Sequence, residues 1–165
     1  MAVLHHRRVG SEFWGEQRLT KDVDLTLLAG FGNEEIYIYE LLANYSTRIA
    51  EAKEFALRNR VLLLQADGIG IDISLVAFPF EEMMIARAQY QIYLPGIELR
   101  VCSAEDLIVL KAFAARGKDW TDSESVLVKQ KKLDWNYINE QLEPPVELKE
   151  EPEILTKLDN LRRSL

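Results

Sequence analysis

The chain has 165 residues, of which 48% are hydrophobic and 28% are charged, a composition typical of one globular domain. Its formal net charge of −7 excludes nucleic-acid binding through a broad basic surface, because such binding depends on neutralising phosphates; a local basic pocket is not excluded. The single cysteine, Cys102, excludes an intrachain disulfide, and the lack of a long apolar run or a signal-peptide core predicts a cytoplasmic protein that does not engage a membrane.

The first predicted element is a strand in "KDVDLTLL", residues 21–28. Successive side chains of a strand point to opposite faces, so Asp22 and Asp24 lie on one face and the apolar residues between them on the other. Two carboxylates at this spacing either form part of a metal site or belong to an exposed polar face. The spacing alone does not decide between the two.

Helices are predicted next at 33–45, where Asn33 is the candidate cap, and at 49–59. A β-hairpin follows, because two apolar runs flank Asp67-Gly68, a strong turn signal. In its second arm, "IGIDISL", the odd positions are apolar and Asp72 lies on the polar face. Asp72 is therefore the candidate third carboxylate beside Asp22 and Asp24.

A short helix is predicted at 80–89, and strands at 90–94 and 97–102 on either side of Pro95-Gly96. From Ser103 the chain becomes helical, and "SAED" has the form of a capping box with Ser103 as cap. Further helices are predicted at 121–130, 134–142 and 151–163. The last two lie on either side of Pro144-Pro145.

These elements predict an α+β fold: a small mixed β-sheet with flanking helices, followed by a helical C-terminal part. We expect one domain over 1–165, with the sheet part at about 1–102 and the helical part at about 103–165. If the three aspartates converge, they offer the hard oxygen ligands that Mg²⁺ takes in proteins, and a nucleoside triphosphate would complete its coordination.

The order of these motifs resembles the nucleotidyltransferase superfamily of the DNA polymerase β type, and within it the minimal nucleotidyltransferases of the AbiEii toxin-like group. The resemblance rests on Gly10-Ser11, then "RLTKDVDL", then "GIDISLV", and it extends from about Gly10 to Asp122. It implies the nucleotidyltransferase fold, with Asp22, Asp24 and Asp72 as catalytic and metal-binding residues for Mg²⁺ or Mn²⁺. Relatives usually have a helix and a strand before the glycine turn, whereas nine residues precede Gly10 here.

The same resemblance implies a nucleotide-binding set. Backbone N–H groups near Gly10 and Ser11 would cradle the phosphates. Arg18 and Thr20 match the family's motif around the aspartates. In the helical block "SAEDLIVLKAFAARGKDWTD", Lys111 would contact the phosphates and Asp119 would support the site.

Each residue of the helical block also has a simpler interpretation. Lys111 lies at the edge of an apolar stripe of its helix. There it is either a solvated lysine or a lysine whose aliphatic chain is buried and whose ammonium group points in a fixed direction. Its replacement by alanine should then leave folding nearly intact. Asp119 and Asp122 are as readily helix caps as functional residues.

Two functions follow from this sequence. The first is a metal-dependent nucleotidyltransferase that moves an NMP group from a nucleoside triphosphate to a hydroxyl of RNA or protein, within a toxin-antitoxin system and with a cognate toxin or antitoxin as partner. The second is a catalytically degenerate relative that binds a nucleotide or a partner. The three aspartates favour the first function, and the short segment before Gly10 favours the second.

Overall fold

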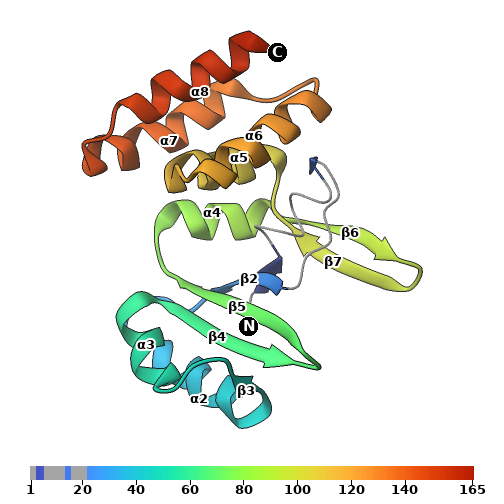
Figure 1. Cartoon of the computed structure of the whole chain (residues 1–165), viewed down its shortest axis with the longest axis vertical. Coiled ribbons are helices and arrows are strands. Elements are labelled where there is room, and N and C mark those ends of the chain that lie inside the picture. The colour runs from blue at the N-terminus through green and yellow to red at the C-terminus, as the bar shows by residue number, and fades with distance from the viewer. Residues whose placement is uncertain (1–2, 6–13, 16–21) are drawn as a thin grey trace. The chain divides into compact units, whose positions relative to one another are not determined.

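The computed structural model describes residues 3–5, 14–15 and 22–165, which cluster into two compact units. The first unit includes the described residues up to Cys102, except 14–15, which belong with Ser103–Leu165 in the second. Figure 1 labels most elements of both. The single domain expected over 1–165 stays a prediction. No helix in the described part of the chain is long and apolar enough to cross a membrane.

The first unit is built on a mixed sheet, as the sequence predicted. The described strands join in the order β3-β4-β5-β2-β1-β7-β6, with β2 parallel to β5, β1 parallel to β7 and the other neighbours antiparallel. Their bounds are β1 Val3–His5, β2 Asp22–Leu28, β3 Ser46–Thr47, β4 Val61–Ala66, β5 Ile69–Val76, β6 Gln89–Leu94 and β7 Ile97–Val101.

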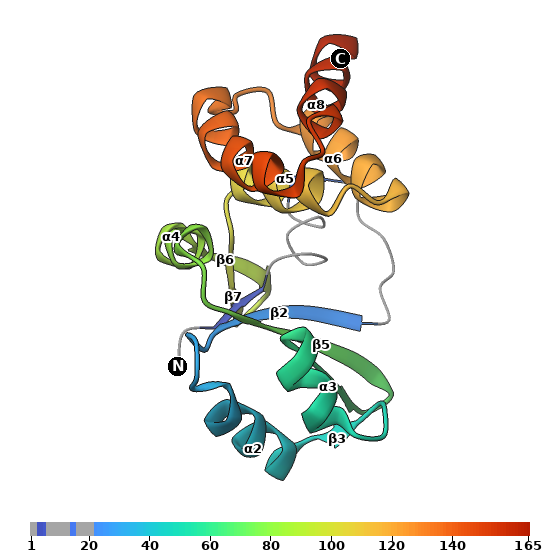
Figure 2. The ribbon, with the colours of Figure 1, turned by 90° about the vertical axis from the view of Figure 1, so that its left-hand side faces the viewer.

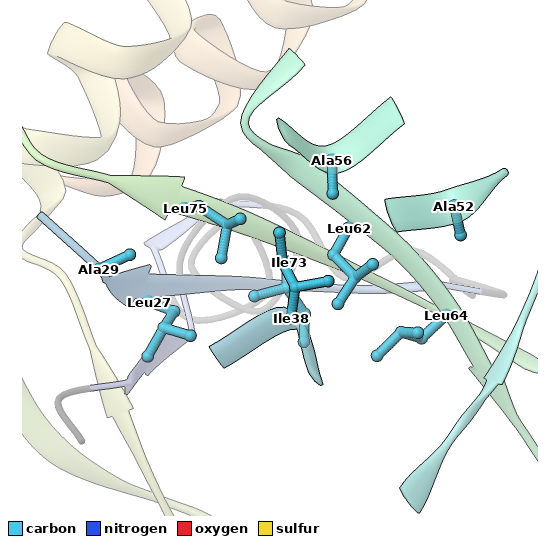
Figure 3. Close-up of a cluster of buried hydrophobic side chains, with 9 residues drawn as sticks. All are labelled: Leu27, Ala29, Ile38, Ala52, Ala56, Leu62, Leu64, Ile73 and Leu75. Carbon is cyan, nitrogen blue, oxygen red and sulfur yellow. The ribbon is translucent and has the colours of Figure 1, made fainter. Parts of the chain in front are cut away.

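Three helices of this unit flank the sheet: α2 Glu34–Asn44, α3 Ala52–Asn59 and α4 Pro79–Arg87. Figure 2 shows α2 and α3 on one side of β2 and β5, and α4 on the other. The core lies under α2 and α3, where alternate strand residues such as Leu27, Ile73 and Leu62 meet Ile38 of α2 and Ala56 of α3 (Figure 3). The opposite face of β2 and β5 carries Asp22, Asp24 and Asp72.

The second unit is helical, as expected beyond Ser103. It contains α5 Ala104–Ala114, α6 Gly117–Lys129, α7 Trp135–Lys149 and α8 Glu153–Ser164. The cap at Ser103 is confirmed, because its hydroxyl accepts the Asp106 N–H at 3.1 Å. Asp134 caps α7 in the same way, because its side chain accepts the Tyr137 N–H at 3.0 Å.

Several boundaries differ from the prediction. Asn33 does precede α2, but its side chain makes no capping hydrogen bond. The two-residue strand β3 was not predicted, because it is too short to show any periodicity. A helix break was predicted at Pro144-Pro145, yet α7 continues through both prolines, and the chain turns at Glu150, whose φ is 58°. Burial of Leu142 and Val146 on either side of the prolines favours the continued helix over the lost backbone hydrogen bonds.

Candidate active site: an aspartate row on two parallel strands

Asp22 and Asp24 on β2 and Asp72 on β5 lie on the same face of the sheet. The parallel register places Asp24 opposite Asp72 and Asp22 opposite Gly70. Leu25 and Leu27, which alternate with the aspartates along β2, pack with the core under α2 and α3. The three carboxylates therefore occupy the opposite face, and the side chains of Asp22 and Asp72 are 31% and 32% exposed. We call these three residues the aspartate row.

Arg48 reaches the aspartate row from the end of β3, and the sequence analysis missed it. Its backbone N–H donates to the Leu63 carbonyl at 3.1 Å, and Leu63 pairs with Asp72 in the β4–β5 register. Arg48 thus continues the line that runs across the sheet through Leu63, Asp72 and Asp24. No local motif marks it, because its position depends on pairing between strands that are distant in the sequence.

The Arg48 guanidinium bridges two of the carboxylates. Its Nη2 forms a charged hydrogen bond with Asp72 Oδ1, and its Nη1 lies 3.6 Å from Asp22 Oδ1. The Arg48 side chain is 27% exposed, so water screens the pairs only in part. One positive charge is thereby placed among three negative ones.

Gly70 makes room for this bridge. A Cβ atom on Gly70 would lie 2.4 Å from Asp22 Oδ1 and 2.8 Å from Arg48 Nη1. Both are closer than carbon and a polar atom approach without displacement, so any larger residue would push the Asp22 carboxylate or the guanidinium aside. The bare backbone of β5 at this position is part of the arrangement.

The donor chemistry of the aspartate row suits a divalent cation, since Mg²⁺ and Mn²⁺ prefer carboxylate oxygens. The arrangement of the side chains does not suit a cation. Among residues 3–5, 14–15 and 22–165, no three His, Cys, Asp or Glu side chains are grouped so that they could hold a metal ion. Asp22 and Asp72 turn toward Arg48 instead. As the side chains lie, the row does not fit a metal ion, and the expected magnesium site stays a prediction.

Lys111 and Asp119 lie in the second unit, where they form a buried charged cluster with Asp122. Lys111 on α5 is only 5% exposed, and its Nζ lies 2.6 Å from Asp122 Oδ2 and 3.5 Å from Asp119 Oδ1. Asp119 is fully buried and also accepts from Arg116, at 3.1 Å from Nη2. The structure thus contradicts the surface-edge position from which Lys111→Ala was expected to leave folding nearly intact, because packing of α6 against α5 buries the ammonium among carboxylates.

The capping interpretation of Asp119 and Asp122 is also wrong. Helix α6 begins at Gly117 after Arg116, so both aspartates lie inside the helix and face Lys111. The four remaining residues of the expected nucleotide site, Gly10, Ser11, Arg18 and Thr20, lie outside the described residues. Their roles stay predictions.

Comparisons with known proteins add little to this geometry. No protein-family model matches the chain, and no curated protein matches it. One similar solved structure is that of an antigenic nucleotidyltransferase-like protein from Paracoccidioides brasiliensis, with 12% sequence identity over 95% of this chain and 84% of that one, at a TM-score of 0.45. A TM-score of this size does not establish a shared fold, and the family resemblance of the sequence stays a prediction.

Proposed function

We propose that the protein is a nucleotidyltransferase that moves an NMP group from a nucleoside triphosphate to a hydroxyl of RNA or protein. The register that sets Asp24 opposite Asp72, with Asp22 on the same face, supports the proposal. It gathers three carboxylates on the partly exposed face of two strands whose opposite face packs in the apolar core. Carboxylates so grouped suit a reaction that deprotonates a hydroxyl near phosphate.

Charge determines what else the reaction needs. A triphosphate and three carboxylates repel each other, so positive charge must accompany the nucleotide. Mg²⁺ or Mn²⁺ is the proposed cofactor and would supply that charge and stabilise the phosphate oxygens. Of the chain's own residues, Asp72 would accept the proton of the hydroxyl, whose oxygen attacks the α-phosphorus of the triphosphate while pyrophosphate leaves. The binding roles of Gly10, Ser11, Arg18, Thr20, Lys111 and Asp119 rest on the sequence resemblance alone.

Label transfer tests the proposal. The protein is incubated with each α-labelled nucleoside triphosphate, Mg²⁺, and either total tRNA or a cell extract. We expect label on one class of acceptor, and loss of that label in Asp22→Asn and in Asp24→Asn, because removing one member of a group that acts together costs nearly as much as removing two.

A matched control is Asp67→Asn, in the exposed β4–β5 turn. Asp67 has a positive φ of 50°, which asparagine also tolerates, so this variant should fold and transfer label like the parent. Transfer that persists in Asp24→Asn would contradict the proposal.

The second candidate is a catalytically degenerate protein of this type that binds a nucleotide or a protein partner. The pairing of Arg48 with Asp22 and Asp72 favours it, because carboxylates committed to a guanidinium are withdrawn from chemistry. Binding of a triphosphate without transfer to any acceptor would support this candidate. A role in a toxin-antitoxin system would be supported by an adjacent gene for a small cognate protein.

A further inference from the structure

We propose that Arg48 is a resident counter-ion of the aspartate row and competes with divalent metal ions for Asp22 and Asp72. The proposal rests on the proposed function only in naming a metal ion as the competitor. It explains why the residues expected to hold a metal are not grouped around a common centre in the described part of the chain.

The geometry makes Arg48 a built-in component of this face. Its backbone is held by the hydrogen bond to Leu63, one strand away from Asp72, so its side chain extends along the line of the aspartates. Gly70 leaves the space in which Nη1 approaches Asp22. A solvated arginine elsewhere on the surface would have neither feature.

The guanidinium and a metal ion cannot hold the same oxygens. Mg²⁺ binds carboxylate oxygens directly at about 2.0–2.1 Å, which a guanidinium hydrogen-bonded to those oxygens prevents. Metal binding at Asp22 and Asp72 therefore requires that Arg48 leaves them. A released guanidinium has donors suited to phosphate oxygens, so a triphosphate that enters with the metal can accept it. Metal alone should accordingly bind weakly.

The experiment is a calorimetric titration of the full chain with Mn²⁺ in the absence of nucleotide. Arg48→Gln removes the competing charge, and we expect it to bind Mn²⁺ at least about tenfold more tightly than the parent, a difference that calorimetry resolves. The matched control is Arg58→Gln on the same unit, at an exposed position of α3, which should bind like the parent. Adding Asp72→Asn to Arg48→Gln should remove the gain.

Equal Mn²⁺ affinity in the parent and in Arg48→Gln would overturn the proposal, as would the absence of Mn²⁺ binding in both. If Arg48→Gln does not fold, Arg48→Lys tests the proposal in its place. The lysine side chain is shorter, and its ammonium pairs with one carboxylate at a time. This variant should give a smaller gain in the same direction, and unchanged affinity would overturn the proposal. Because no nucleotide is present, these outcomes are independent of label transfer, and either proposal can fail alone.

Discussion

At the scale of single residues, the ion pairs that Arg48 forms with the aspartate row are partly exposed to water. Asp72 and Arg48 are 32% and 27% exposed, and ion pairs with this much water around them contribute little. We therefore expect Asp72→Asn to change the free energy of unfolding by less than about 1 kcal/mol, with the amide still accepting a hydrogen bond from Arg48. Urea denaturation measures this. A loss of several times that amount would mean that the row is a structural element.

Lys111 differs from Arg48 because it is buried. Alanine at this position would leave Asp119 without its ammonium partner in a site where Asp119 has no exposed surface. Lys111→Ala should lower the free energy of unfolding by about 1–3 kcal/mol, the cost of leaving buried polar groups short of a partner, since Arg116 still pairs with Asp119. The control Lys118→Ala, at an exposed position of α6, should stay within about 0.5 kcal/mol. A near-neutral Lys111→Ala would contradict the burial of this cluster.

At the scale of elements, Arg60 joins three segments of the first unit. It ends α3, its Nε donates to the Leu75 carbonyl of β5 at 2.8 Å, and its Nη2 donates to the Gly30 carbonyl at 3.0 Å. Its Nη1 also pairs with Glu34 at the start of α2. Helices α2 and α3 are thus fixed to the strand that carries Asp72.

The pH dependence of folding tests this link. The Glu34 pKa is lowered from its usual value by a hydrogen bond from its own backbone N–H and then by the Arg60 guanidinium. A lowered folded-state pKa means that this stabilisation is present above the unfolded-state pKa, about 4.3, and is lost as pH falls through the lowered value. Unfolding free energies measured from pH 7 down to 3 should fall less steeply below about pH 4.5 in Glu34→Gln than in the parent. Parallel curves would contradict the lowered pKa of Glu34.

Local signals predicted some elements well. The turn at Asp67-Gly68 was predictable because both residues adopt a positive φ, which this pair tolerates. The cap at Ser103 was equally clear from its spacing to Asp106. Strand β3 was not predictable, since two residues show no alternation and its pairing with β4 is determined by distant sequence. Arg48 was missed for the same reason.

At the scale of the whole molecule, composition and periodicity predicted the α+β class and the change from sheet to helices at Ser103. They also placed Asp22, Asp24 and Asp72 on polar faces. Periodicity could not predict that β2 and β5 are direct neighbours in parallel register, which brings Asp24 beside Asp72. Nor could it predict that a cation from the same chain lies among the carboxylates.

The most direct test of the central claim, that the aspartate row is a nucleotide site, is a calorimetric titration with each of the four nucleoside triphosphates in the presence of Mg²⁺. We expect binding heat for at least one triphosphate with the parent protein and its loss in Asp24→Asn, while the control Asp67→Asn retains it. An absence of heat for all four triphosphates, or an unchanged heat in Asp24→Asn, would contradict the account.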